Sequence, residues 1–261
     1  MPKLSKDYRF LDLSDYGRPA AIIFANYIKD SRLTSIHITI LFILSGLTAV
    51  FYILQGQYLY AGVLLILKSI LDAADGELSR IKNRPSYIGR YLDSISDIII
   101  NFLIITSIGY KTNSPLLYSF LALLAIQFQG TLYNYYYVIL RNNSSDGDNT
   151  SRIFEYTSPK ALNGESQYTV DLLFNIYKTL YGLFDDIVYR IDKSALRLKN
   201  FPKWFMTIVS LYGLGFQLMI TSTMLALGLI DYIIPFFIYY TGITGLIVSI
   251  RKYFINEFMW L

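Results

Sequence analysis

Four aspartates within one short stretch are the residues of this chain whose types and spacing could do chemistry. The stretch, LDAADGELSRIKNRPSYIGRYLDSISD, covers residues 71–97 and lies between two long apolar stretches. Asp72 and Asp75 are three residues apart, and Asp93 and Asp97 are four apart. Residues at these spacings share a helix face, with Cβ atoms about 5–6 Å apart. The sequence therefore predicts two carboxylate pairs, each on one face of a helix.

The segment between the two pairs favours a reversal of the chain. Pro85 and Gly89 favour breaking and redirecting a helix, and a tight reversal would let the pairs face each other. Two carboxylates about 5 Å apart repel by roughly 3 kcal/mol at an effective dielectric of 20, so a cation must offset the repulsion. The chain has no cysteine and one histidine, His37, which excludes thiolate and His-rich metal sites. Oxygen ligands alone suit a hard cation, Mg²⁺ or Mn²⁺.

Neighbouring residues indicate a phosphate-bearing substrate. Gly76 and the small Ser79 would let a ligand approach the backbone closely. Arg80 lies about one turn beyond Gly76, where a guanidinium would contact a phosphate oxygen. Mg²⁺ is commonly shared between carboxylates and substrate phosphates. The alternative is that the aspartates only mark helix ends at a membrane interface, where a helix N-terminus favours acids.

The composition indicates an integral membrane protein with an all-α fold. Of its 261 residues, 54% are hydrophobic and only 16% are charged, and the mean hydropathy is +0.39. A soluble domain has about 25% charged residues, and a bilayer span needs about 20 mostly apolar residues. Six spans are predicted, at residues 34–54, 58–75, 93–110, 115–140, 204–228 and 231–250.

The basic residues predict the orientation of these spans. Of the 23 Lys and Arg residues, 21 lie before the first span, around the aspartate turn, in the loop after the fourth span or in the tail. Because cytoplasmic loops carry an excess of Lys and Arg, we expect both termini, the aspartate turn and the long loop in the cytoplasm. The glycosylation patterns at Asn142 and Asn149 would then stay unmodified.

The chain is expected to form one domain with four parts. Residues 1–33 would be a cytoplasmic segment with an interfacial helix, and 34–141 would hold the first four spans and the motif. Residues 142–203 would form a cytoplasmic loop, and 204–261 the last two spans and the C-terminus. In the loop, apolar residues at helical spacing predict an amphipathic helix, either on the cytoplasmic leaflet or packed on the protein's own cytoplasmic face.

The motif resembles the signature of the CDP-alcohol phosphotransferase (phosphatidyltransferase) family, D-x2-D-G-x2-A-R-x8-G-x3-D-x3-D. The match departs from it only at Ser79, which stands in place of alanine. The six-helix layout and the N-terminal interfacial helix are also similar to the family. The resemblance implies that an alcohol attacks the β-phosphorus of a CDP-alcohol, CMP leaves and a phosphodiester forms, in phospholipid biosynthesis. It also implies Mg²⁺ or Mn²⁺, surrounding membrane lipids and a homodimer, with no role for nucleic acid; in a bacterium the location would be the cell inner membrane.

The resemblance implies roles for individual residues. Asp72, Asp75 and Asp93 would hold the divalent metal or metals, and Asp97 would be the general base. The residues that would contact the nucleotide diphosphate are Gly76, Ser79, Arg80, Ser86 and Gly89.

The entrance of the first span departs from the family. The family often has Thr-Pro-Asn-x-x-Thr there, whereas this chain has Thr34-Ser35-Ile36-His37-Ile38-Thr39. Without the proline and asparagine, only Thr34 and Thr39 remain as candidates for cytidine binding. We interpret His37 as an interfacial residue rather than a catalytic one.

Several readings stay open at this point. The lipid could arrive as CDP-diacylglycerol, or as diacylglycerol that accepts a CDP-linked head group. A phosphorylated acceptor would need further basic residues, and Lys82, Arg84, Arg90 and Arg141 are available. A cation-coupled transporter would instead place acids along a path across the membrane, and a catalytically silent relative would serve as a binding protein.

Overall fold

The computed structural model describes residues 4, 6–143 and 155–255, and this part of the chain is helical, as predicted. Its α-helices are α1 (Arg18–Ile28), α2 (Ser35–Leu54), α3 (Tyr58–Ile81), α4 (Tyr87–Lys111), α5 (Leu116–Asn143), α6 (Gln167–Ile191), α7 (Lys203–Ser210), α8 (Leu214–Ala226), α9 (Ile233–Tyr240) and α10 (Thr244–Ile250). Short 3-10 turns are η1 (Lys6–Tyr8), η2 (Leu13–Asp15), η3 (Lys193–Arg197), η4 (Ile230–Tyr232) and η5 (Thr241–Ile243), and η6 (Arg251–Ile255) is π-helical.

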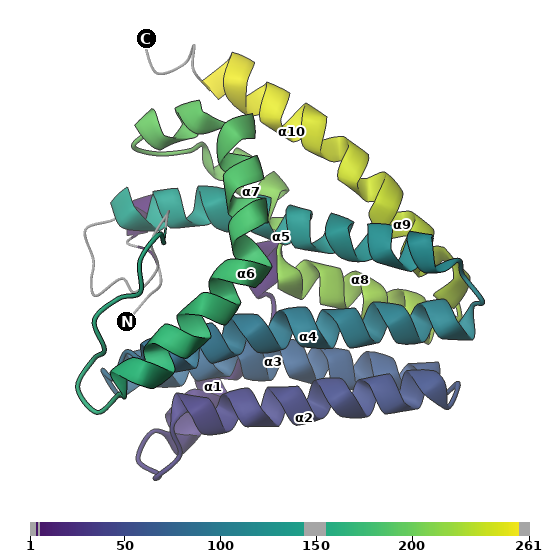
Figure 1. Ribbon diagram of the computed structural model, residues 1–261, viewed down its shortest axis with the longest axis horizontal. Coiled ribbons are helices and arrows are strands. Elements are labelled where there is room, and N and C mark those ends of the chain that lie inside the picture. Colours follow the sequence, from purple (N-terminus) through teal and green to yellow (C-terminus); the bar gives the residue numbers. More distant parts are fainter. Residues whose placement is uncertain (1–3, 5, 144–154, 256–261) are drawn as a thin grey trace.

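The long helices form a bundle along the longest axis of the molecule (Figure 1). α2, α3, α4, α5 and α8 run along this axis, and α3 packs against α1, α2 and α8. α6 packs on α4 and α5 and crosses them at one end of the bundle. The same end of the bundle holds α1, the α3–α4 turn and the C-terminal ends of α5 and α10 (Figure 1). The elements that the charge pattern assigns to one side of the membrane are therefore grouped together.

Within the described residues, four helical segments are long and apolar enough to cross a membrane: Ser35–Leu54, Tyr87–Lys111, Leu116–Asn143 and Ile230–Tyr253. A fifth is added if α7 and α8, which meet at a bend of 48°, form one span. The predicted count of six is therefore not confirmed. The difference is the predicted span at 58–75, because α3 carries five charged side chains between Lys68 and Arg80. Neighbouring helices bury much of α3, including its Ala61, Leu65 and Leu78.

The N-terminal segment lies against the chain at the bend between α7 and α8. The N-terminal segment crosses the beginning of α8, and the hydroxyl of Ser14 accepts a hydrogen bond from the Gly215 amide at 3.1 Å. A Cβ at Gly215 would lie only 1.9 Å from the Ser14 carbonyl oxygen, so this crossing requires glycine. The predicted fifth span, 204–228, is thus a broken helix.

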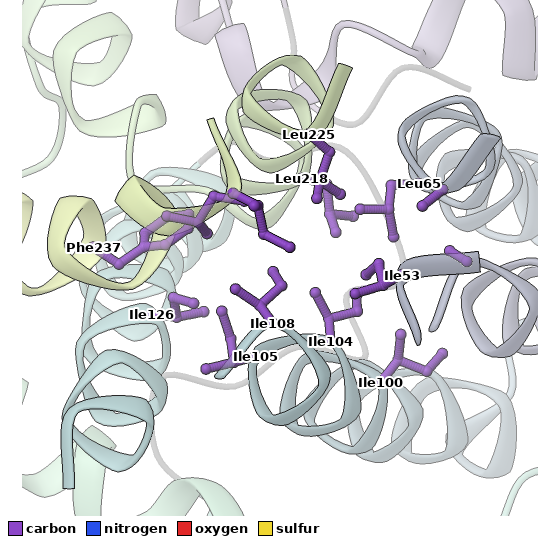
Figure 2. Packing of buried hydrophobic residues seen from close by; sticks show 14 of the residues in the cluster. Ile53, Leu65, Ile100, Ile104, Ile105, Ile108, Ile126, Leu218, Leu225 and Phe237 are labelled. Carbon is purple, nitrogen blue, oxygen red and sulfur yellow. The ribbon is translucent and has the colours of Figure 1, made fainter. Parts of the chain in front are cut away.

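An apolar core joins α2, α3, α4, α5, α8 and α9. Ile100, Ile104 and Ile108 of α4 recur at a spacing of four, so they share one face. Figure 2 shows this face meeting Leu65 from α3 and Leu218 from α8. α2 packs on both α3 and α4, the two helices that carry the aspartates, and the core joins all three.

α1 is the helix expected near the N-terminus. Its Ala21 and Ala25 pack on Ala74 of α3. Ile23 and Tyr27 on the other face are 72% and 88% exposed. An exposed apolar face suits the membrane interface, and that location of α1 stays a prediction.

α6 is the amphipathic helix expected in the long loop, and it packs on the protein itself. Val170, Phe174 and Tyr177 are buried against Tyr91 and Ile95 of α4. A second apolar group of α6 remains exposed: Leu172, Ile176, Leu183 and Ile187. The acceptor pattern at Asn149, in the same predicted loop, lies in residues 144–154, outside the described residues.

A buried ion pair ties the segment after α6 to the last helix. Asp192 and Arg251 are both fully buried and form a salt bridge. The Tyr136 hydroxyl donates to Asp192 Oδ2 at 2.8 Å, and the Tyr135 hydroxyl donates to the Asp192 carbonyl oxygen at 3.0 Å. In the sequence Arg251 counts only as a tail charge, because its partner lies 59 residues away.

Candidate active site

The reversal between α3 and α4 places the aspartates on facing helices. α3 ends at Ile81, and Asn83 adopts a positive φ of 51°. Ser86 caps α4, and its Oγ accepts a hydrogen bond from the Gly89 amide at 2.8 Å. The break thus falls around Pro85, and Gly89 lies inside the first turn of α4 rather than at the break. Asp93 is correspondingly about two turns into α4, not at its start.

Three of the aspartates form a cluster. One carboxylate oxygen from each of Asp72, Asp75 and Asp93 lies within 4.8 Å of the other two. Asp93 Oδ1 is buried and has no hydrogen-bond partner among the described residues. Thr39 Oγ1 donates to Asp75 Oδ2 at 2.8 Å, which restricts the orientation of that carboxylate. A buried orphan oxygen in a set of carboxylate donors fits a hard divalent cation.

The fourth aspartate has a different partner. Lys68 Nζ lies 2.6 Å from Asp97 Oδ1, and the Lys68 ammonium also lies 4.8 Å from the centre of the Phe42 ring. Lys68 is fully buried, so its charge depends on Asp97 for compensation. Lys68 lies within the predicted span 58–75 and was not among the candidate site residues. The available signal was that it precedes Asp72 by four residues and therefore shares its helix face.

Arg80 lies beside the cluster in an ionic network that the sequence did not indicate. Glu77 Oε1 is 2.8 Å from Arg80 Nη2 and 2.8 Å from Arg18 Nε. A Cβ at Gly76 would lie 3.4 Å from Arg80 Nη1, so the guanidinium is adjacent to that glycine. Arg18 also reaches Asp15 at 3.3 Å. Glu77 thus holds two guanidinium groups near the triad.

The other predicted ligand contacts are engaged in local structure. Ser79 Oγ donates to the Arg84 carbonyl oxygen at 2.8 Å, and Ser86 Oγ donates to Glu165 at 2.7 Å. Thr34 and His37 form a helix cap, in which His37 Nδ1 accepts from the Thr34 amide at 3.2 Å. Of the two threonines considered at this entrance, Thr39 hydrogen-bonds to an aspartate and Thr34 caps α2.

One cavity of about 370 Å³ contains the chemistry-bearing residues. All four aspartates and Gly76 line it, whereas Ser79, Arg80, Ser86 and Gly89 do not. Further lining residues that the sequence did not single out include Asn101, Gln127, Thr131, Asn134, Tyr177 and Tyr181. The cavity is therefore bounded by α3, α4, α5, α6 and α8, and by the segment around η2.

Two tyrosines of α6 form one wall of this cavity. The Tyr177 and Tyr181 rings stack with centroids 4.7 Å apart, and the Tyr181 hydroxyl donates to the Ser94 carbonyl oxygen at 2.9 Å. Burial raises the pKa of both phenols above the ordinary value. Both therefore stay protonated at neutral pH.

Acidic residues before α6 attach it to the start of α4. Glu165 Oε1 accepts from the Ser86 hydroxyl at 2.7 Å and from the Ile88 amide at 2.9 Å. Glu155 pairs with Arg90, and its Oε2 accepts from the Tyr91 hydroxyl at 2.7 Å. These contacts place the wall that carries Tyr177 and Tyr181.

Replacing Glu165 by alanine is expected to destabilise the protein by about 1–3 kcal/mol, because hydrogen-bond donors at the start of α4 lose their acceptor. Thermal unfolding in detergent would measure the change. Asp186→Ala is the matched control, since Asp186 is an exposed acid on the same segment. Equal melting temperatures for the two variants would contradict an attachment by Glu165.

Comparison with known proteins agrees with the motif. Residues 33–149 match the family model described as CDP-alcohol phosphatidyltransferase. The chain is also 46% identical over 67 residues to a protein of Thermococcus kodakarensis named bifunctional IPC transferase and DIPP synthase. That match spans 25% of this chain and only 15% of the relative. Residues 33–149, which carry all four aspartates, are therefore a domain of the CDP-alcohol phosphatidyltransferase family.

Proposed function

We propose that the protein transfers a phosphoryl-alcohol group from a CDP-alcohol to a hydroxyl acceptor and releases CMP in lipid synthesis. The observation that carries this proposal is one cavity lined by all four motif aspartates, three of them within 4.8 Å of one another. The family match and the similarity to a transferase support the same reaction class.

Asp72, Asp75 and Asp93 would hold one or more Mg²⁺ or Mn²⁺ ions. The bound cation would neutralise charge on the diphosphate and improve CMP as a leaving group. Thr39 keeps the Asp75 carboxylate oriented through its hydrogen bond. Gly76, which lines the cavity without a side chain, leaves room for the diphosphate.

Asp97 would act as the general base. Its Oδ1 is bound by Lys68, and its Oδ2 would take the proton of the acceptor hydroxyl. The alcohol oxygen then forms a bond to the β-phosphorus, and the bond between that phosphorus and the bridging oxygen breaks. The electron pair leaves with CMP. Lys68 positions the carboxylate and does not contact the reacting atoms.

Replacing Lys68 by methionine is expected to lower kcat by about 10- to 100-fold, the usual cost of losing a group that orients an active-site residue. Metal affinity is expected not to fall, because Asp97 lies outside the triad and the substitution removes a positive charge from the helix face of Asp72. Turnover and Mn²⁺ binding measured on the same preparation would test this. Lys111→Met, at the C-terminal end of α4 and outside the cavity, is the control. Wild-type kcat in a folded Lys68→Met protein would contradict the positioning role.

Two other functions fit the observations less well. A cation-coupled transporter predicts acids spread along a path, whereas these aspartates line one cavity and come from the second half of α3 and the first half of α4. A catalytically silent relative acting as a binding protein has no need of a complete set of four motif aspartates.

The reverse reaction tests the proposed function without knowledge of the alcohol. The purified protein in lipid vesicles would receive labelled CMP, Mg²⁺ or Mn²⁺, and a total lipid extract. We expect a labelled CDP-alcohol with metal and none with EDTA. If no product forms with either metal, in conditions that support a known relative, the proposed transferase activity is contradicted. The alternative of a catalytically silent binding protein would then remain.

We also propose from the charge pattern that both termini and the site face the cytoplasm, with one domain spanning the membrane. The homodimer implied by the family resemblance is a proposal of the same kind.

A further inference from the structure

A stripe of neutral polar residues on α5 lines the cavity together with the aspartates. Gln127, Gly130, Thr131 and Asn134 follow helical spacing and all line the cavity. Asn101, one turn beyond Asp97 on α4, lines it as well. The glutamine, threonine and asparagine side chains bring amide and hydroxyl groups into a helix bundle, where polar groups are costly unless they form hydrogen bonds.

Thr131 supplies a second observation that points to a ligand. The residue is 4% exposed, and its Oγ1 has no hydrogen-bond partner among the described residues. Buried polar atoms are nearly always paired. A hydroxyl-bearing ligand in the cavity would satisfy it.

The charge of the cavity restricts which ligand fits. Five carboxyl groups line it, those of Asp15, Asp72, Asp75, Asp93 and Asp97. In residues 4, 6–143 and 155–255, no Lys or Arg lines it. The proposed metal ions would offset the donor's diphosphate. A further phosphate on the acceptor would need cationic side chains of its own.

The basic residues near the site lie outside the cavity, and two of the four available to a phosphorylated acceptor are bound to other groups. Lys82 Nζ donates to the carbonyl oxygens of Ser31 and Leu33 at 2.8 and 2.6 Å. Arg90 pairs with Glu155, and Arg80 with Glu77. Arg84 and Arg141 likewise do not line the cavity. None of the four basic residues that a phosphorylated acceptor would require is placed to bind it there.

We propose that this part of the cavity binds the polar alcohol, and that this alcohol is an uncharged polyol without a phosphate group. Gln127, Thr131, Asn134 and Asn101 can each donate and accept hydrogen bonds, which matches a ligand with several hydroxyl groups. The acceptor hydroxyl would lie between this stripe and Asp97. The inference rests on the proposed function and names its substrate class.

The direct test compares matched alcohols with and without phosphate. The protein in vesicles with CDP-diacylglycerol and Mn²⁺ would receive glycerol, myo-inositol, glycerol 3-phosphate, myo-inositol 1-phosphate, serine or ethanolamine, and CMP release would be measured. We expect an uncharged polyol to exceed every phosphorylated or amino alcohol at least tenfold in kcat/KM. A preference for a phosphorylated or amino alcohol would overturn the inference.

The labelled-CMP exchange with a total lipid extract separates this inference from the proposed function. Exchange without activity toward either polyol overturns the inference and leaves the transferase. If neither exchange nor CMP release is detected, both the polyol inference and the proposed transferase function are contradicted.

Two variants locate the polyol. Gln127→Leu and Thr131→Val are expected to raise the KM for the active polyol about three- to tenfold, the size of one neutral hydrogen bond. The KM for CDP-diacylglycerol should stay unchanged. Thr223→Val is the control, since that hydroxyl donates to the Met219 carbonyl oxygen of its own helix at 2.8 Å. An unchanged polyol KM in both cavity variants would overturn the assignment.

Discussion

Replacing Asp93 by asparagine is expected to abolish transfer and to weaken Mn²⁺ binding by more than about 100-fold, the upper cost of losing even a residue that only supports a metal ligand. Asp93 contributes one of three carboxylates whose oxygens lie within 4.8 Å. Its buried Oδ1 has no other partner among the described residues. The substitution removes one negative charge and keeps the size of the side chain. Manganese titration by electron paramagnetic resonance and CMP exchange would measure the two effects.

The control for this experiment is Asp231→Asn, which removes an exposed carboxylate outside the cavity. It should bind Mn²⁺ and exchange CMP as the wild type does. If Asp93→Asn binds Mn²⁺ with unchanged affinity, the three aspartates are not the metal site, whatever happens to activity.

Asp97→Asn should lower turnover about 10²- to 10⁴-fold, the usual contribution of a general base. Mn²⁺ affinity should be retained, because the Asp97 carboxylate pairs with Lys68 and lies outside the triad. The contrast with Asp93→Asn separates a base from a metal ligand. CMP exchange and manganese titration on both variants make the comparison. Full activity in Asp97→Asn would contradict the assignment of Asp97 as the general base.

The ion pair complicates this variant in a predictable way. Asp97→Asn leaves the buried Lys68 ammonium without its carboxylate, which costs about 3–5 kcal/mol of stability. The double variant Lys68→Met with Asp97→Asn removes both charges and should recover most of that loss without recovering turnover. Thermal unfolding of the three proteins distinguishes an inactive fold from an inactive site.

The broken α7–α8 segment shows where prediction from hydropathy ends. Residues 204–228 are apolar enough to be read as one span, yet Ser14 crosses at Gly215 and the helix bends by 48°. Nothing in the hydropathy of that segment signals a crossing by a residue about 200 positions earlier. The charged half of α3 shows the opposite case, in which the sequence already carried the five charges that separate α3 from the apolar spans.

The sequence by itself determined what depends on neighbours within one helix. The spacings of Asp72 with Asp75 and of Asp93 with Asp97 set shared faces, because helix geometry repeats every 3.6 residues. Pro85 and the residues around it set the reversal that brings the faces together. The absence of cysteine and the single histidine left oxygen ligands and hence a hard cation.

Only the tertiary structure decided which partners meet across helices. It paired Lys68 with Asp97 over 29 positions, attached Glu165 to Ser86 over 79, and placed Tyr181 against Ser94 over 87. It also lined the cavity with the α5 stripe and left the basic residues outside it. Such pairings follow from the packing of whole helix faces, which no local spacing encodes. The four aspartates can therefore be recognised in the sequence. The surrounding residues that would determine which alcohol binds beside them cannot.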